Sequence, residues 1–260
     1  MLQLINSNEL NVTVDLQSGG RMSSVKFHGY EFVIPNNEKV LHWGWYPMVP
    51  WAGRINKGEY LGPLSKVQLP TNLMPPHAIH GFGHSEVWLD EGSGISSCKF
   101  KGVFAGSSAI QEIRVIENSI YYKLQYQPGS CELPAWLGLH TWFPWIIDSS
   151  PKAVIDFSAG SMLKLSADGI PNGELIPVSQ GPWDDTFTNI VGFPKVNWPG
   201  IASLEIASNV DWWTYYTKDK DVFCIEPLNA PPDAIRIGQL NGNTHNLEVT
   251  FTFNQDFAER

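Results

Sequence analysis

Leu247-Glu248-Val249-Thr250-Phe251-Thr252-Phe253, near the end of the chain, alternates strictly between apolar and polar side chains. Successive side chains of a β-strand point to opposite faces, so this period of two predicts a strand that is buried on one face. The same alternation recurs in residues 120–126 and 10–14. No long segment has the apolar spacing of an amphipathic helix. The sequence therefore predicts a nearly all-β fold.

Composition supports the same fold class. The chain contains 11 Trp, 8 Tyr and 13 Phe together with 23 Gly and 19 Pro, a mixture that favours pleated strands and tight turns. Asn241-Gly242-Asn243, just before the last strand, is typical turn chemistry. We expect most Trp side chains in the core, although a flat indole can also pack against the apolar face of a sugar ring.

Length and local composition predict one domain without a membrane segment. A chain of 260 residues is normal for a single large β sandwich or barrel, and no linker, repeat or low-complexity tract divides it. The opening residues lack the basic flank and apolar core of a secretion signal, and no stretch is long and apolar enough to span a bilayer. We therefore expect a cytoplasmic protein.

Cysteine usage and net charge restrict the partners. Cys98, Cys131 and Cys224 are odd in number and far apart, which predicts core thiols in a reducing compartment rather than a disulfide framework. With 17 Lys and Arg against 26 Asp and Glu, the net charge is -9. Such an acidic chain is a poor partner for nucleic acid or an anionic membrane.

Glu226 is the first candidate for chemistry. It follows the apolar run of residues 222–225 and precedes Pro227, which predicts a carboxylate at the end of a strand. A strand would place it on the same face as Cys224, where an ionised carboxylate is unfavourable unless that face opens into a polar cleft. Pro231-Pro232-Asp233 would hold the departing loop still. The alternative is a Glu that merely ends a strand in solvent.

An arginine stands alone in an uncharged segment. Arg54 lies within residues 47–55, which contain no other charged side chain. Its five donors suit the oxygens of a ligand. The alternative is a stem packed on Trp51 with the guanidinium in water.

Histidines form two further clusters. His77, His80 and His84 lie close together, but intervening Gly residues prevent a helix from aligning them, and no carboxylate or Cys lies at a characteristic metal spacing. We therefore expect no metal site there. His140 is flanked by large aromatic residues such as Trp142, and the alternative to a catalytic role is a core His bonded to a backbone carbonyl.

Six segments, in order along nearly the whole chain, carry a family resemblance. They are Ser18-Gly19-Gly20-Arg21-Met22-Ser23-Ser24-Val25 with Gly29-Tyr30-Glu31-Phe32, Pro50-Trp51-Ala52-Gly53-Arg54-Ile55 with Gly58-Glu59-Tyr60, His80-Gly81-Phe82 with Trp88, His140-Thr141-Trp142-Phe143, Trp183-Asp184-Asp185-Thr186-Phe187, and Cys224-Ile225-Glu226-Pro227 with Pro231-Pro232-Asp233-Ala234. Together they resemble the motifs of the aldose 1-epimerase (galactose mutarotase) family.

The resemblance implies a fold and an activity. It implies that residues 1–260 form one galactose mutarotase-like β-supersandwich, which interconverts the α and β anomers of an aldose. Glu226 would be the base and His140 the acid of ring opening. Arg54 and His80 would hold the ring oxygen and nearby hydroxyls, and Asp184 would accept from a remote hydroxyl.

Three further expectations accompany that scheme. Asp185 could substitute for Asp184, which we prefer because it stands three residues before Phe187, as in the family. The proton transfers need no nucleotide, flavin or metal, and the chain has no Gly-rich loop of the kind that binds phosphates, so no cofactor is expected. A bulky Trp142, where the family commonly has Pro-Tyr after the second His, would narrow the pocket, and Gly53 replaces a common Asn.

Alternative functions remain open at this stage. The family also includes enzymes acting on hexose 6-phosphates, but Arg is scarce here and no motif resembles a phosphate clamp, so a free sugar is favoured, although Lys57 leaves a phosphate possible. A non-catalytic carbohydrate-binding β-sandwich would not need both an acid and a base. A lyase or hydrolase would need a metal or paired carboxylates, and the adjacent Asp184 and Asp185 would face opposite sides of a strand.

Overall fold

The computed structural model of the chain describes residues 1–62, 66–242 and 244–256. In these residues the regular structure is almost entirely β, and the only helical elements are three short 3₁₀ turns, η1 (Asn56–Gly58), η2 (Gly83–Ser85) and η3 (Gly102–Phe104). The predicted all-β class is therefore confirmed. None of the helices found there could reach across a membrane.

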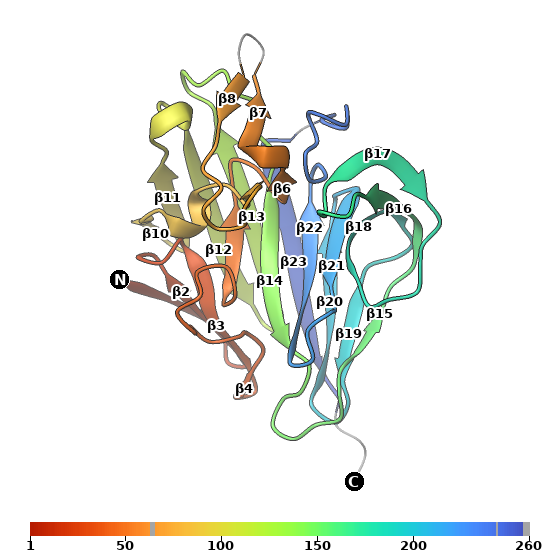
Figure 1. The fold of residues 1–260 in the computed structure, drawn as a ribbon. Coiled ribbons are helices and arrows are strands. Elements are labelled where there is room, and N and C mark those ends of the chain that lie inside the picture. The colour runs from red at the N-terminus through yellow and green to blue at the C-terminus, as the bar shows by residue number, and fades with distance from the viewer. Residues whose placement is uncertain (63–65, 243, 257–260) are drawn as a thin grey trace.

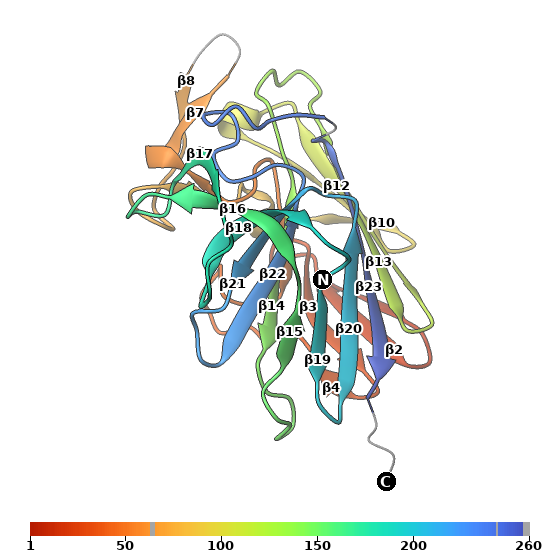
Figure 2. The same cartoon turned by 90° about the vertical axis from the view of Figure 1, so that its right-hand side faces the viewer.

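Two large antiparallel sheets pack face to face (Figures 1 and 2). The first sheet, in spatial order, consists of β1 (Leu2–Asn6), β2 (Leu10–Asp15), β3 (Arg21–Phe27), β5 (Trp45–Met48), β14 (Gly138–Pro144), β22 (Val222–Leu228), β21 (Trp212–Tyr216), β18 (Asp184–Ile190), β16 (Ala159–Leu165) and β17 (Pro171–Ile176), with β4 (Tyr30–Glu31) paired to β3.

The second sheet forms the other layer of the sandwich. Its strands, in spatial order, are β10 (Leu89–Gly92), β11 (Ile95–Lys99), β12 (Ser108–Ile116), β13 (Ser119–Gln127), β23 (Asn246–Gln255), β20 (Ala202–Ser208), β19 (Lys195–Trp198) and β15 (Val154–Asp156). Two small two-stranded sheets pair β6 (Arg54–Ile55) with β9 (Ala78–Ile79) and β7 (Glu59–Leu61) with β8 (Lys66–Gln68).

All three strands predicted from alternation are present, as β2, β13 and β23. In β23 the apolar positions are buried and the intervening polar positions are exposed or half-buried. Phe251 stacks on Trp45 of the facing sheet with ring centroids 4.6 Å apart. Burying an aromatic side chain of this size contributes about 1.5–3 kcal/mol, so the apolar face of β23 is a major contact between the two sheets.

The core contains most of the Trp side chains, as expected, and Trp183 is half-buried. Cys98 and Cys224 are buried as predicted, whereas Cys131 is half-buried, and none of the three is paired. In the predicted turn before β23, Gly242 has a φ of 74°, while Asn243 lies outside the described residues.

The central strands of the first sheet have a second face, which looks away from the other sheet. Loops and the hairpin of β16 and β17 rise around that face (Figures 1 and 2). Cross-strand pairing aligns Tyr46 with His140, Glu226 with Thr214, and Thr214 with Thr186. The flanking pairs of β14 and β22 place His140 opposite Glu226. One row of side chains from five strands therefore crosses this face, because directly opposed residues share a side of a sheet.

Candidate active site

Glu226 lies inside β22, which corrects the prediction that it ends a strand. β22 continues to Leu228, and Glu226 and Pro227 both pair with β21. Pro227 made the end of the strand look plausible because it lacks an N–H. Pairing with β14 is interrupted around it, and there the hydroxyl of Thr141 donates to the carbonyl of Ile225 at 2.6 Å. An irregular ladder on one side thus accommodates the proline.

Glu226 and His140 face each other in a cavity of about 210 Å³ on this face of the sheet. Nε2 of His140 lies 3.2 Å from Oε1 of Glu226, and both side chains are almost completely buried. Thr186 and Thr214 share a hydrogen bond of 2.8 Å and also line the cavity. The buried position excludes a Glu that merely ends a strand in solvent.

Burial shifts both members of this pair toward their uncharged forms. Removal from water, together with the negative charge of Asp184, raises the pKa of Glu226 well above 4.5, and the guanidinium of Arg54 opposes the shift. Removal from water also lowers the pKa of His140 well below 6.5. A carboxyl that is a strong base, next to an imidazole that is a strong acid once protonated, is typical of a site that moves protons.

Two aromatic rings hold the imidazole of His140. The ring of Tyr46 stacks on the imidazole with the two ring centroids 4.7 Å apart. The ring of Trp142 also stacks on it, with centroids 5.1 Å apart. The Trp142 indole N–H and the Tyr46 hydroxyl both donate to the carbonyl of Leu41, at 2.7 and 3.2 Å. Nδ1 of His140 is buried and has no hydrogen-bond partner among the residues that the structure describes, so packing rather than a backbone carbonyl there orients this ring.

Sequence reasoning missed the residue beneath Tyr46. The guanidinium of Arg21 is buried, lies 4.9 Å from the centre of the Tyr46 ring, and donates to four backbone carbonyls, those of Ser18, Val40, Trp43 and His84. Burial lowers its pKa to about 10. A charged residue that directly precedes the apolar Met22 in a strand was the available signal, but nothing local indicated its acceptors.

A small two-stranded sheet positions Arg54 and His80. Arg54 of β6 pairs with Ile79 of β9, and His80 follows directly. Nδ1 of His80 accepts from the N–H of Gly53 at 3.3 Å, so the ring proton of the neutral form is on Nε2. Burial lowers the pKa of His80 well below 6.5, so this imidazole is a neutral donor, and it lines the cavity.

Gly53 is required by the packing of the Pro231-Pro232-Asp233 loop. Its φ is 74°, and a Cβ atom there would lie 2.5 Å from Cγ of Pro232. No side chain fits that gap, so the Asn common in the family at this position would displace Pro232. The departure from the family pattern therefore has a steric reason in this chain.

Arg54 and Asp184 close one side of the cavity. Nη2 of Arg54 lies 3.0 Å from Oδ2 of Asp184, and both side chains remain partly exposed. Asp184 lines the cavity, whereas Asp185 is not among the lining residues and accepts the N–H of Asp184 at 3.1 Å. Trp142 also lines the cavity, at the position where a bulky side chain was expected to narrow it.

The three clustered histidines point to different partners. Nδ1 of His77 accepts from the N–H of Lys57 at 3.1 Å, and its Nε2 lies 3.4 Å from a carboxylate oxygen of Asp168. His84 is buried against the ring of Tyr46, and burial lowers its pKa to about 4. The N–H of Gly53 donates separately to His80, so within the described residues the three histidines share no common centre.

One group of described residues has the composition of a metal site. Potential ligand atoms of His140, Cys224 and Glu226 all lie within 4.8 Å of one another. A thiol must ionise to bind metal well, and burial raises the pKa of Cys224 well above 9.0. A protonated Cys224 is therefore a weak ligand in this group.

Comparison with known proteins supports the fold and the resemblance read from the sequence. Neither a protein-family model nor a curated protein matches the sequence. Three solved structures share the fold. A candidate aldose 1-epimerase from Escherichia coli K12 matches with a TM-score of 0.81 and 17% identity, over 98% of this chain and 99% of that chain. A galactose mutarotase-like protein from Clostridium acetobutylicum matches with a TM-score of 0.78 and 13% identity, over 97% of this chain and 94% of that chain, and a GalM/aldose epimerase homologue from C. elegans matches with a TM-score of 0.76 and 14% identity, over 98% of this chain and 99% of that chain.

These matches confirm the predicted galactose mutarotase-like β-supersandwich. They span nearly the whole chain, 98% and 97% of it for the first two structures. At such low identity they establish the fold alone. What the cavity does must be argued from its own side chains.

Proposed function

We propose that this chain is an aldose 1-epimerase that interconverts the α and β anomers of a free, unphosphorylated aldose. The observation that carries the proposal is the buried pair of Glu226 and His140, 3.2 Å apart and facing a cavity. A purely structural role would favour apolar residues at these positions, because burying two ionisable groups costs stability. Retention of such a costly pair in a cavity points to a function.

Ring opening moves two protons at this pair, one taken up by Glu226 and one given out by His140. Glu226 as carboxylate takes the proton of the anomeric hydroxyl, the C1–O1 bond becomes a carbonyl, and the C1–ring oxygen bond breaks. His140 as imidazolium donates its Nε2 proton to the departing ring oxygen. The open aldehyde turns about C1–C2, and reclosure on the other face returns both protons by the reverse steps.

The pKa shifts match the direction of that transfer. Before ring opening the pair is charged, with Glu226 ionised and His140 protonated. After ring opening the pair is neutral, which is the form that burial favours for both groups. The buried environment therefore assists the proton transfers that open the ring.

The remaining polar groups suit the sugar. The neutral His80 can donate from Nε2 to the ring oxygen or a neighbouring hydroxyl, and Arg54 can donate to the same region. Asp184 can accept from a hydroxyl remote from the anomeric carbon. In the empty cavity Arg54 and Asp184 satisfy each other, so substrate hydroxyls would replace or join this ion pair.

The lining favours an unphosphorylated sugar. Arg54 is the only Lys or Arg among the described lining residues, and its charge is already offset by Asp184. Lys57 is exposed and does not line the cavity. A phosphate would meet Glu226 and Asp184 without a free cation to balance it, which disfavours the hexose 6-phosphate alternative.

Anomer exchange at equilibrium tests the proposal. Saturation transfer between the two anomeric protons is measured by NMR with purified protein, for common hexoses and pentoses and for their 6- or 5-phosphates. We expect faster exchange than in buffer for at least one free aldose. No acceleration with any sugar would refute the epimerase function and favour a non-catalytic carbohydrate-binding protein, and acceleration of phosphates alone would refute the substrate class.

A further inference from the structure

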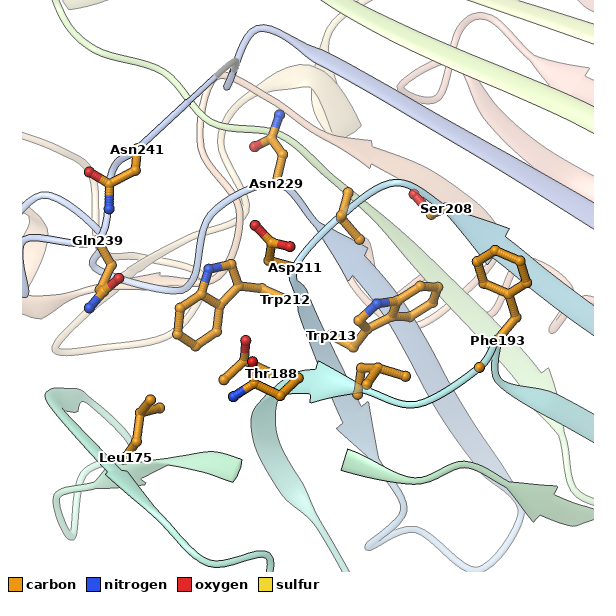
Figure 3. Close-up of a pocket in the computed structure, with 14 residues that line it drawn as sticks. Leu175, Thr188, Phe193, Ser208, Asp211, Trp212, Trp213, Asn229, Gln239 and Asn241 are labelled. Carbon is orange, nitrogen blue, oxygen red and sulfur yellow. The ribbon is translucent and has the colours of Figure 1, made fainter. Parts of the chain in front are cut away.

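A second pocket, larger than the catalytic cavity, lies beside the ends of β18 and β21 and reaches Ser208 of β20 in the second sheet. Its volume is about 550 Å³ (Figure 3). The pair Thr188 and Trp212 lines it, two residues further along β18 and β21 than the pair Thr186 and Thr214 of the catalytic cavity. At about 3.4 Å per residue, the two pairs are about 7 Å apart.

The two pockets are separate. The side chain of Ile237 packs against Gly173, where a Cβ atom would lie 3.3 Å from Cβ of Ile237. This contact joins the hairpin of β16 and β17 to the loop of residues 229–241. Gly169 and Pro232 of the same two segments line the catalytic cavity, and Leu175 and Gln239 line the second pocket. In both segments, therefore, the residue that makes this contact lies between a residue that lines the catalytic cavity and one that lines the second pocket.

Two indole N–H groups in this pocket have no acceptor. Trp212 and Trp213 are 8% and 2% exposed, and neither Nε1 atom has a hydrogen-bond partner in the described part of the chain. Neither atom is sealed from solvent. By contrast, most other indoles donate to backbone carbonyls, namely those of Trp45, Trp88, Trp136, Trp142, Trp145, Trp183 and Trp198. The two free donors are therefore available to a ligand.

Polar side chains surround Trp212. Figure 3 shows the carboxylate of Asp211 beside its indole, with the amides of Gln239 and Asn241 on the same side of the pocket. None of these three side chains has a hydrogen bond or ion pair within the described residues. Asn229 is different, because its amide already binds the backbone of residues 137, 244 and 246.

We propose that this pocket is a second saccharide-binding site, separate from the catalytic cavity, that binds a neutral sugar ring. Hydroxyl groups can accept from the indoles and donate to Asp211, and the amides can do both. Aromatic rings supply the apolar surface that sugar C–H groups pack against. No Lys or Arg occurs among the described lining residues, so the single carboxylate would repel sugar phosphates and uronates.

Indole resonances of the ¹⁵N-labelled protein test the proposal. The probes are methyl β-D-glucopyranoside and methyl β-D-galactopyranoside, which have no free anomeric hydroxyl, with glucose 6-phosphate and glucuronate as anionic counterparts. The Trp212→Phe variant assigns the Trp212 signal. We expect at least one neutral probe to shift the Trp212 and Trp213 N–H signals saturably, while neither anionic probe does so.

Variants separate this site from the catalytic cavity. Asp211→Ala should weaken the affinity for the neutral probe roughly tenfold, as expected for loss of a hydrogen bond to a charged group. The control Asp221→Ala, which alters an exposed carboxylate in the turn directly before β22, should not change it. Glu226→Gln should leave the Trp212 shift intact, and Asp211→Ala should leave anomer exchange intact.

Each remaining outcome would overturn the proposal. These are the absence of a saturable Trp212 shift with both neutral probes, an equal shift with the anionic probes, and loss of the shift in Glu226→Gln. The epimerase proposal fails independently, through absence of anomer exchange. A Trp212 shift without exchange would leave a saccharide site in a non-catalytic protein, and exchange without a shift would leave an enzyme with one sugar site.

Discussion

Replacing Glu226 with Gln removes the base of the proposed reaction while changing the shape of the side chain very little. The amide keeps the size of the carboxyl and its place opposite His140, and in the wild-type protein that contact is 3.2 Å long. Because the side chain is 4% exposed, water has little room to take over as base. The variant therefore separates proton removal from packing.

The expected loss follows from these surroundings. A positioned general base contributes about 10²–10⁴-fold, so kcat should fall by roughly a hundredfold or more. That loss corresponds to about 2.7 kcal/mol of transition-state stabilisation. Affinity for the sugar should change much less, because Arg54, His80 and Asp184 remain. His140→Asn removes the acid and should cause a loss of similar size.

The double variant tests whether the two groups act together. Acid and base serve one coupled ring opening, so Glu226→Gln with His140→Asn should be far less than multiplicatively worse than either single variant. Losses that simply multiply would indicate independent roles and contradict the scheme.

Saturation-transfer NMR on an accelerated aldose measures all of these rates, with circular dichroism as the check of folding. Glu248→Gln, which alters an exposed carboxylate paired to Lys123, is the matched control and should keep the wild-type rate. If folded Glu226→Gln retained near wild-type kcat, Glu226 would not be the base.

Four further predictions concern pH, stability, metal and binding. The pair must hold one proton in total, so kcat/KM should be bell-shaped. The acid limb lies below 6.5, where the pair takes a second proton, and the alkaline limb lies above 4.5, where the pair loses its last one. Glu226→Gln should abolish the acid limb, because no base is left to protonate, while the fall in rate with rising pH should persist because His140 must still carry its proton. Because the folded-state pKa of Glu226 is raised, its contribution to stability is lost as pH rises above 4.5; scanning calorimetry should give Glu226→Gln a higher Tm than wild type at pH 8 and a similar one at pH 4, and equal values at both would argue against the shift. Dialysis against EDTA should leave anomer exchange unchanged, and a loss restored by Zn²⁺ would turn His140, Cys224 and Glu226 into ligands. Asp184→Asn should mainly raise KM, and a fall in kcat at constant KM would place Asp184 in the chemistry instead.

The sequence alone determined the strands with a strict period of two. The alternation in residues 247–253 predicts β23 because adjacent side chains of a strand face opposite ways wherever the strand lies. Family resemblance indicated the cavity residues Arg54, His80, His140 and Glu226, since each stands in a short motif that can be recognised locally.

Local signals failed where pairing was decided elsewhere. Pro227 predicted the end of a strand at Glu226, but β21 continues to pair beyond it. The chain had no local sign that Arg21 would be buried beneath Tyr46, because its acceptors come from four separate positions. A backbone ladder or a buried cation is satisfied by residues distant in sequence.

Tertiary structure also decided which groups meet. The contact between His140 and Glu226 depends on the register of strands that are far apart along the chain, and a shift of one residue would turn one of them to the opposite face. The second pocket brings Asp211 from the turn before β21 and Gln239 from the loop after β22 into one lining. Side-chain periodicity is a property of a segment, whereas register and loop packing depend on the whole chain, so only the folded structure places these groups together.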